Sequence, residues 1–139
     1  VAQVFLGMNL KCASCHDSFF DSWRLEDTYA FANVFGDRPL EMHECEQPLG
    51  KRPAAALPYP ELGTLEGAAT PEERRTKAAA LLTGKENTRF ARAFANRIWA
   101  RLFGRGLIEP VDELDRPAEA PELLDLLAAE LVRSAYDPK

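Results

Sequence analysis

The spacing of hydrophobic and polar residues along the chain predicts a mainly helical protein. Hydrophobic positions that recur every three or four residues place one side of a segment in a core, which is typical of an amphipathic helix. The clearest case is the leucine stripe of Leu123, Leu124, Leu127 and Leu131. We expect helices over residues 2–16, 21–35, 71–83, 88–103 and 121–134.

Local sequence signals support several of these limits. Thr70-Pro71-Glu72-Glu73 is a capping box with proline at the first helical position, which is a strong helix start. Gly36, Gly84 and Gly104 follow three of the predicted helices. Glycine is the residue most common just after a helix, because it adopts a left-handed backbone without a steric penalty.

Prolines and glycines interrupt the helical pattern between residues 37 and 69. Leu40 and Met42 alternate with polar neighbours, which favours a short strand there. The rest of this stretch is longer than most loops of compact domains. We therefore expect three parts: residues 1–50, a Pro/Gly-rich linker or wrapping loop over 51–69, and a C-terminal half of three helices over 70–139.

Composition narrows the class of protein. The chain has 139 residues, of which 46% are hydrophobic and 28% charged, and this is ordinary for a globular domain. Its net charge of −5 disfavours a nucleic-acid-binding role. No hydrophobic run reaches the roughly 20 residues that a membrane span needs. The chain begins at Val1 with a hydrophobic segment, so we expect it to be a piece of a longer protein.

One motif carries a specific chemistry. Cys12-Ala13-Ser14-Cys15-His16 is a C-x-x-C-H sequence, the attachment signature of c-type haem. Two cysteines three positions apart on a helix face the same side and can form thioethers with one haem. The adjacent histidine then supplies the proximal ligand to the iron. We expect one covalent haem c, held by Cys12, Cys15 and His16.

Other interpretations of the cysteines are open. A thioredoxin-like redox pair would need a βαβ context, and no such pattern precedes the motif. A structural zinc site could form from Cys12, Cys15, His43 and Cys45, which match the ligands that zinc prefers. In the haem interpretation Cys45 is left over, and we expect it to be a buried structural cysteine.

The residues around the motif suit a porphyrin. Phe19, Phe20 and Trp23 follow the motif closely, and aromatic side chains are natural packing partners for a flat apolar ring. Met42 or His43 could fold over the distal face and supply the sixth iron ligand. An open sixth site, as in a haem enzyme, is the third interpretation.

The ordered motifs of the chain resemble a family. Asp21 and Trp23 follow the C-x-x-C-H motif, Pro39-Leu40-Glu41-Met42 lies in the loop, and Asn96-Arg97-Ile98-Trp99 and Phe103-Gly104-Arg105-Gly106 come later. This set resembles planctomycete-type multidomain cytochrome c proteins. It is similar to the end of one domain of unknown function and to the start of its partner domain.

The resemblance implies an exported bacterial redox protein with further haem domains. The chain would then be an electron-transfer module, located in the periplasm or at the cell surface. Its partners would be a redox protein or other haem domains of the same parent chain, with no nucleic acid and no membrane span in this segment. Whether the parent protein is an enzyme is left open.

The predicted helix over residues 88–103 is rich in arginine. Arg97 and Arg101 fall on the side that also carries phenylalanines, so we expect both to be partly buried. Their counter-charges would come from the acidic segment 109–115. We also expect Trp99 to be the centre of the core that the C-terminal helices share.

Overall fold

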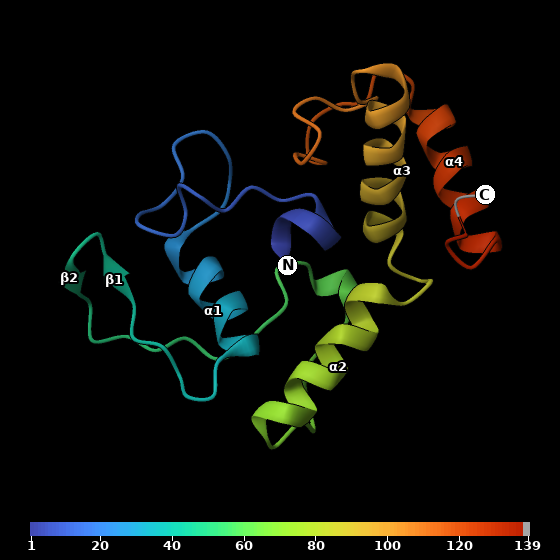
Figure 1. Ribbon diagram of the computed structural model, residues 1–139. Coiled ribbons are helices and arrows are strands. Elements are labelled where there is room, and N and C mark those ends of the chain that lie inside the picture. The colour runs from blue at the N-terminus through green and yellow to red at the C-terminus, as the bar shows by residue number, and fades with distance from the viewer. Residues whose placement is uncertain (138–139) are drawn as a thin grey trace. The chain divides into compact units, whose positions relative to one another are not determined.

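The computed structural model describes residues 1–137 and is mainly helical, as predicted (Figure 1). A short π-helix, η1 (Ala2–Leu6), is followed by α1 (Leu25–Phe35) and by the strands β1 (His43–Glu44) and β2 (Gln47–Pro48). A 3₁₀ turn, η2 (Pro60–Leu62), then precedes α2 (Pro71–Thr83), α3 (Thr88–Phe103) and α4 (Pro121–Arg133). None of the helices in this described part is long and apolar enough to cross a membrane.

The chain forms two compact units. The middle unit contains residues 10–81, and the terminal unit joins residues 1–9 to the chain from Leu82 onward. Helix α2 therefore lies almost wholly in the unit that carries the C-x-x-C-H motif. The sequence pattern placed α2 in the C-terminal half together with α3 and α4. The limits that it predicted for the domains remain a prediction.

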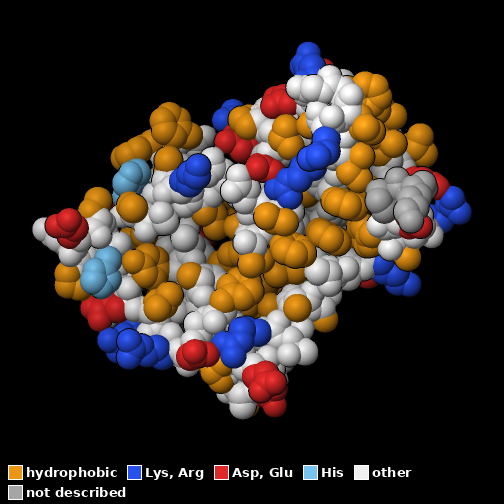
Figure 2. Space-filling model, in the orientation of Figure 1, with side chains coloured by type: hydrophobic (Ala, Val, Ile, Leu, Met, Phe, Trp, Pro, Cys, Tyr) orange, Lys and Arg blue, Asp and Glu red, His pale blue; other side chains and the backbone are white. Residues whose placement is uncertain are grey.

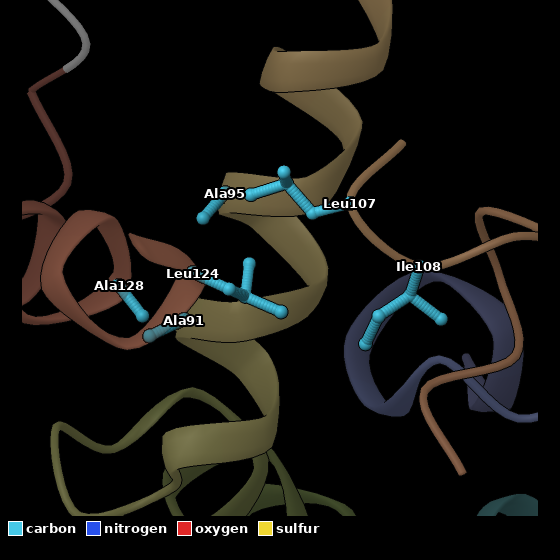
Figure 3. Close-up of a cluster of buried hydrophobic side chains, with 6 residues drawn as sticks. All are labelled: Ala91, Ala95, Leu107, Ile108, Leu124 and Ala128. Atoms are coloured by element: carbon cyan, nitrogen blue, oxygen red, sulfur yellow. The ribbon is translucent and has the colours of Figure 1, made fainter. Parts of the chain in front are cut away.

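The core of the terminal unit lies between α3 and α4. Small residues of α3 let α4 approach closely, and Leu124 of α4 fills the space beside Ala91 and Ala95 with no exposed surface (Figure 3). Leu107 and Ile108, from the segment after α3, complete the cluster. Trp99 is only half-buried at the edge of this cluster, so the expectation that it forms the centre was wrong.

A buried asparagine holds the segment that follows α3. The Asn96 side chain is fully buried, and its Nδ2 donates to the carbonyls of Ile108 (3.0 Å) and Val111 (3.1 Å). Its Oδ1 accepts from the Ile108 amide at 3.0 Å. A Cβ on Gly106 would lie 2.5 Å from the Ile108 carbonyl oxygen. After α3 ends, the chain turns back and packs closely on this helix. That packing requires both the Asn96 side chain and the absence of a side chain at Gly106.

The N-terminal segment belongs to the same unit because it packs on α3. Arg97 donates to the carbonyls of Val4 (2.8 Å) and Gln3 (2.5 Å), and it also pairs with Asp112. The ring of Phe5 stacks on that of Phe90 with centroids 5.3 Å apart. One arginine of α3 thus satisfies the open carbonyls of η1 and neutralises an acidic residue beyond α3.

Three of the four arginines of α3 form ion pairs. Arg97 pairs with Asp112, and Arg89 lies 2.9 Å from Asp115, both within the predicted acidic segment. Arg92 pairs instead with Asp125 of α4 at 3.3 Å. Arg101 is exposed and forms no ion pair within residues 1–137, so the prediction that it is partly buried and paired was wrong.

The predicted helix over residues 2–16 was also wrong in extent. It ends at Leu6, because Gly7 adopts a left-handed backbone with φ of 59°. The helix predicted from residue 21 begins only at Leu25. The Asp21 carboxylate accepts from the Trp23 amide at 2.9 Å and holds a turn there.

The remaining helix limits are confirmed. The Thr70 hydroxyl accepts from the Glu73 amide at 3.2 Å, and the Glu73 carboxylate accepts from the Thr70 amide at 3.0 Å. This is the predicted capping box. Helix α3 has the predicted limits and ends at Gly104, which has φ of 82°.

Two arginines of α2 hold the end of α1 in the middle unit. Arg74 donates to the carbonyls of Val34 (3.2 Å) and Gly36 (2.5 Å). Arg75 donates to the Phe35 carbonyl at 3.2 Å and pairs with Asp37 at 2.8 Å. Cations at a helix C-terminus satisfy its open carbonyls and match the negative end of its dipole. These contacts hold together elements that about forty residues of chain separate.

Candidate functional site

The C-x-x-C-H motif forms one tight turn rather than the end of a helix. The amides of Cys15 (3.1 Å) and His16 (3.3 Å) both donate to the Cys12 carbonyl. Ala13 is buried beneath the turn, whereas Cys12 and Cys15 are exposed free thiols. A single turn brings the two cysteines together as a helix would, so the geometry that haem attachment needs does not depend on the helix that was predicted.

The histidine of the motif is held in one tautomer. Its Nδ1 lies 2.8 Å from the backbone carbonyl of Asp17. A carbonyl oxygen only accepts hydrogen bonds, so Nδ1 carries the proton and Nε2 keeps a free lone pair. Metal-ligating histidines usually donate their second nitrogen to such a partner, which orients the ring. The bond to Asp17 thus leaves Nε2 as the ring nitrogen that is free of this contact.

Asp17 connects this histidine to α1. Its carboxylate accepts from the Leu25 amide at 2.9 Å, at the first residue of α1. Anionic groups are favourable at a helix N-terminus, because they accept from its open amides and match its dipole. The residue whose carbonyl orients His16 is thus fixed by a helix that packs in the middle unit.

The predicted haem-packing aromatics divide into two groups. Trp23 is half-buried and meets Tyr59 edge-on, with ring centroids 5.3 Å apart. Phe19 and Phe20 are 82% and 81% exposed, and Phe19 lies against the His16 ring at 4.8 Å. Figure 2 shows hydrophobic side chains standing on the surface beside a histidine. Phe19 and Phe20 therefore form an exposed hydrophobic surface next to the motif.

The two distal-ligand candidates lie in different surroundings. Met42 is buried, and its backbone bonds to Leu49 and Lys51 extend the pairing of β1 with β2. His43 is exposed at the start of β1, and its amide donates to the Tyr29 hydroxyl at 3.1 Å. The short strand predicted near Leu40 and Met42 thus lies slightly later in the chain.

Cys45 is exposed, so the expectation that it is a buried structural cysteine was wrong. It lies at the tip of the hairpin of β1 and β2, with a left-handed φ of 53°. Its amide donates to the Cys15 carbonyl at 2.9 Å, which places the tip beside the motif (Figure 1). The haem interpretation gave no reason to expect this contact across 30 positions, whereas the zinc interpretation had brought the same two cysteines together.

The zinc interpretation lacks a preformed site. No group of three or more His, Cys, Asp or Glu side chains that could hold a metal ion occurs among residues 1–137. The residues do fit a covalent haem. They offer two exposed thiols on one turn, an imidazole with a free Nε2 and an exposed aromatic surface beside it.

Two protein families match parts of the chain. Residues 1–39 match the family described as PSCyt2, protein of unknown function (DUF1549), and residues 74–139 match PSD1, protein of unknown function (DUF1553). No curated protein and no solved structure matches the chain. Residues 1–39 and 74–139 are therefore similar to parts of two planctomycete-type domains of unknown function, as the motifs had indicated.

Proposed function

We propose that the chain transfers electrons through one covalently attached c-type haem, as a module of an exported bacterial redox protein. The observation that carries this proposal is the turn from Cys12 to His16. It presents two free thiols together with a histidine whose Nδ1–H donates to the Asp17 carbonyl. This combination is what a c-type haem requires of a protein.

Each residue of the site has a separate task in this proposal. Cys12 and Cys15 would form the two thioethers, and His16 would bind the iron through Nε2. Phe19 and Phe20 would pack on the macrocycle and lose their exposure to water. A bound haem c supplies a one-electron couple, whose potential depends on the axial ligands and on the surrounding polarity. The Asp17 carbonyl would keep the His16 ring in one orientation in both oxidation states.

The distal ligand stays a proposal with two candidates. Burial of Met42 means that ligation through its sulfur would draw the side chain out of the interior. The exposed His43 could reach a surface-bound group without that rearrangement. Replacement of His43 by alanine and of Met42 by leucine, each followed by absorption spectra and potentiometry, identifies the ligand. If neither change alters the spectrum and carbon monoxide binds the reduced protein, the open-site haem enzyme is the better interpretation.

The haem itself is tested by mass spectrometry. The chain is exported in a bacterial host that has cytochrome c maturation proteins, and the intact mass is measured after acid extraction. We expect a mass increase of one haem. The double replacement of Cys12 and Cys15 by serine should abolish it, whereas Cys45→Ser should keep it as the matched control. An unmodified mass from this host would contradict the proposal.

An extracytoplasmic location follows from the same chemistry. Thioether formation on C-x-x-C-H needs reduced cysteines and haem delivered outside the cytoplasm, so the parent gene should encode an export signal. The partner would be another redox protein or a further haem domain of the parent chain. The acidic net charge of −5 gives no support to nucleic-acid binding.

A further inference from the structure

We propose that Cys15 and Cys45 form a disulfide in the haem-free chain, and that this bond competes with haem attachment. The pairing joins a cysteine of the C-x-x-C-H turn to the tip of the hairpin of β1 and β2. The disulfide depends only on the fold. Its effect on haem loading rests on the proposed function.

The backbone places these two cysteines within bonding reach. The Cys45 amide donates directly to the Cys15 carbonyl at 2.9 Å. A hydrogen bond of this length leaves the two Cα atoms about 5–6 Å apart, because only the N–Cα, C=O and C–Cα bonds add to it. Native disulfides join residues whose Cα atoms are about 4.4–6.8 Å apart. The separation of the two Cα atoms therefore permits a disulfide.

The contact between Cys45 and Cys15 is held in place by the hairpin of β1 and β2. Glu44 pairs with Gln47, so Cys45 is the first residue of a two-residue turn. Outside the turn, Met42 is buried and bonds through its backbone to Leu49 and Lys51. The hairpin thereby keeps Cys45 in position, and both thiols are accessible to an oxidant.

Cys15 has two other cysteines as possible partners, and its thiolate is the reactive form in disulfide exchange. Cys12 is the competing partner, since its carbonyl accepts from the Cys15 amide across the turn. The experiment must therefore distinguish two pairings of the same sulfur.

The reaction needs an oxidant, and a low-molecular-weight disulfide is sufficient. The Cys45 thiolate attacks this reagent, one thiolate leaves, and a mixed disulfide forms on Cys45. The Cys15 thiolate then attacks the Cys45 sulfur, and the second thiolate leaves. The chain loses two protons and two electrons, which together are two hydrogen atoms, and the reagent takes them up to become two thiols. A Cys15 sulfur bound in this way cannot form a thioether.

Peptide mapping tests the disulfide on the haem-free chain. The protein is made without maturation proteins, treated with oxidised glutathione and digested without reduction. We expect a cross-linked pair of peptides containing Cys15 and Cys45, with a loss of two hydrogen atoms. The link should persist in Cys12→Ser and disappear in Cys45→Ser. A Cys12–Cys15 link alone, or glutathione adducts on unlinked cysteines, would overturn the proposal.

Haem loading tests the competition. In a host with maturation proteins, Cys45→Ser should carry haem on a larger fraction of chains than the original sequence, because no Cys45 thiol is left to capture Cys15. Equal loading of the two proteins would refute the competition. Absence of haem from both would refute the proposed function, whereas the disulfide would still be decided by the peptide map.

Discussion

Replacement of Asn96 by alanine should destabilise the terminal unit more than any change at its surface. The side chain is fully buried and makes three hydrogen bonds to the backbone at Ile108 and Val111. Alanine would leave the amide and carbonyl of Ile108 without partners in the interior, and the less buried carbonyl of Val111 could turn to water. A buried polar group that loses its partner costs about 1–3 kcal/mol. We therefore expect the free energy of unfolding to fall by about 2–5 kcal/mol, out of the roughly 5–15 kcal/mol that stabilises a domain.

Urea unfolding measures this loss. The chain contains two tryptophans, so a Trp23→Phe background leaves Trp99 of α3 as the fluorescent reporter of the terminal unit. Asn96→Asp keeps the acceptor for the Ile108 amide but turns an oxygen toward two carbonyls, and it should also be destabilised. Arg101→Ala is the matched control on the same helix. Its side chain is exposed and unpaired within residues 1–137, so we expect a change within about 0.5 kcal/mol.

A second measurement locates the effect. In Asn96→Ala the amides of residues 105–112 should exchange their hydrogens faster, since they lose the side chain that holds them. If Asn96→Ala unfolds within about 0.5 kcal/mol of the parent chain, our account of this side chain as the anchor of the returning segment is wrong.

Three further changes test other parts of the structure. Leu124→Ala should cost about 2–5 kcal/mol in urea unfolding because the side chain is fully buried, whereas Leu126→Ala, 66% exposed, should change little. Thr70→Ala should cost about 1 kcal/mol through loss of the capping box. The Thr70 amide lowers the pKa of Glu73, so this carboxylate stabilises α2 above the ordinary pKa of 4.5 and ceases to do so as the pH falls through the lowered value. Acid melts of Glu73→Gln should lack that dependence. Tyr136→Phe should raise stability by about 1 kcal/mol, because the hydroxyl is buried without a partner within the described chain. Burial raises the pKa of Tyr136, so the parent chain should lose stability above pH 10.0 and this variant should not.

Helices with strong local start and stop signals were predictable from the sequence. Helix α3 begins at an asparagine cap and ends at a left-handed glycine, and α2 begins at a capping box, so local chemistry sets their limits. Residues 7–16 were predicted wrongly because the hydrophobic pattern continues past Gly7. This glycine ends the short helix with a left-handed backbone, and Leu114 packs closely against it. The periodicity of the segment concealed that local stop signal.

In the candidate site, too, some features were predictable from the sequence and others were not. The C-x-x-C-H motif is a short local signal, and its chemistry could be inferred from five consecutive residues. The bond between Nδ1 of His16 and the Asp17 carbonyl, and the approach of Cys45 to Cys15, depend on backbone paths that no periodicity encodes. The prediction for Arg101 was wrong for a related reason. Periodicity gives the side of the helix on which an arginine lies, but not whether an acidic residue folds against that side.

The packing of η1 on α3 has a consequence for how this pair of domains is inherited. Residues that match one family supply Phe5 and the carbonyls of Gln3 and Val4, and residues that match the other supply Phe90 and Arg97. A gene rearrangement that separated the two matched segments would remove the contacts between η1 and α3. The two segments should therefore behave in evolution as one recombination unit, and chimaeras joined between residues 39 and 74 should fold only when both parents conserve these pairings.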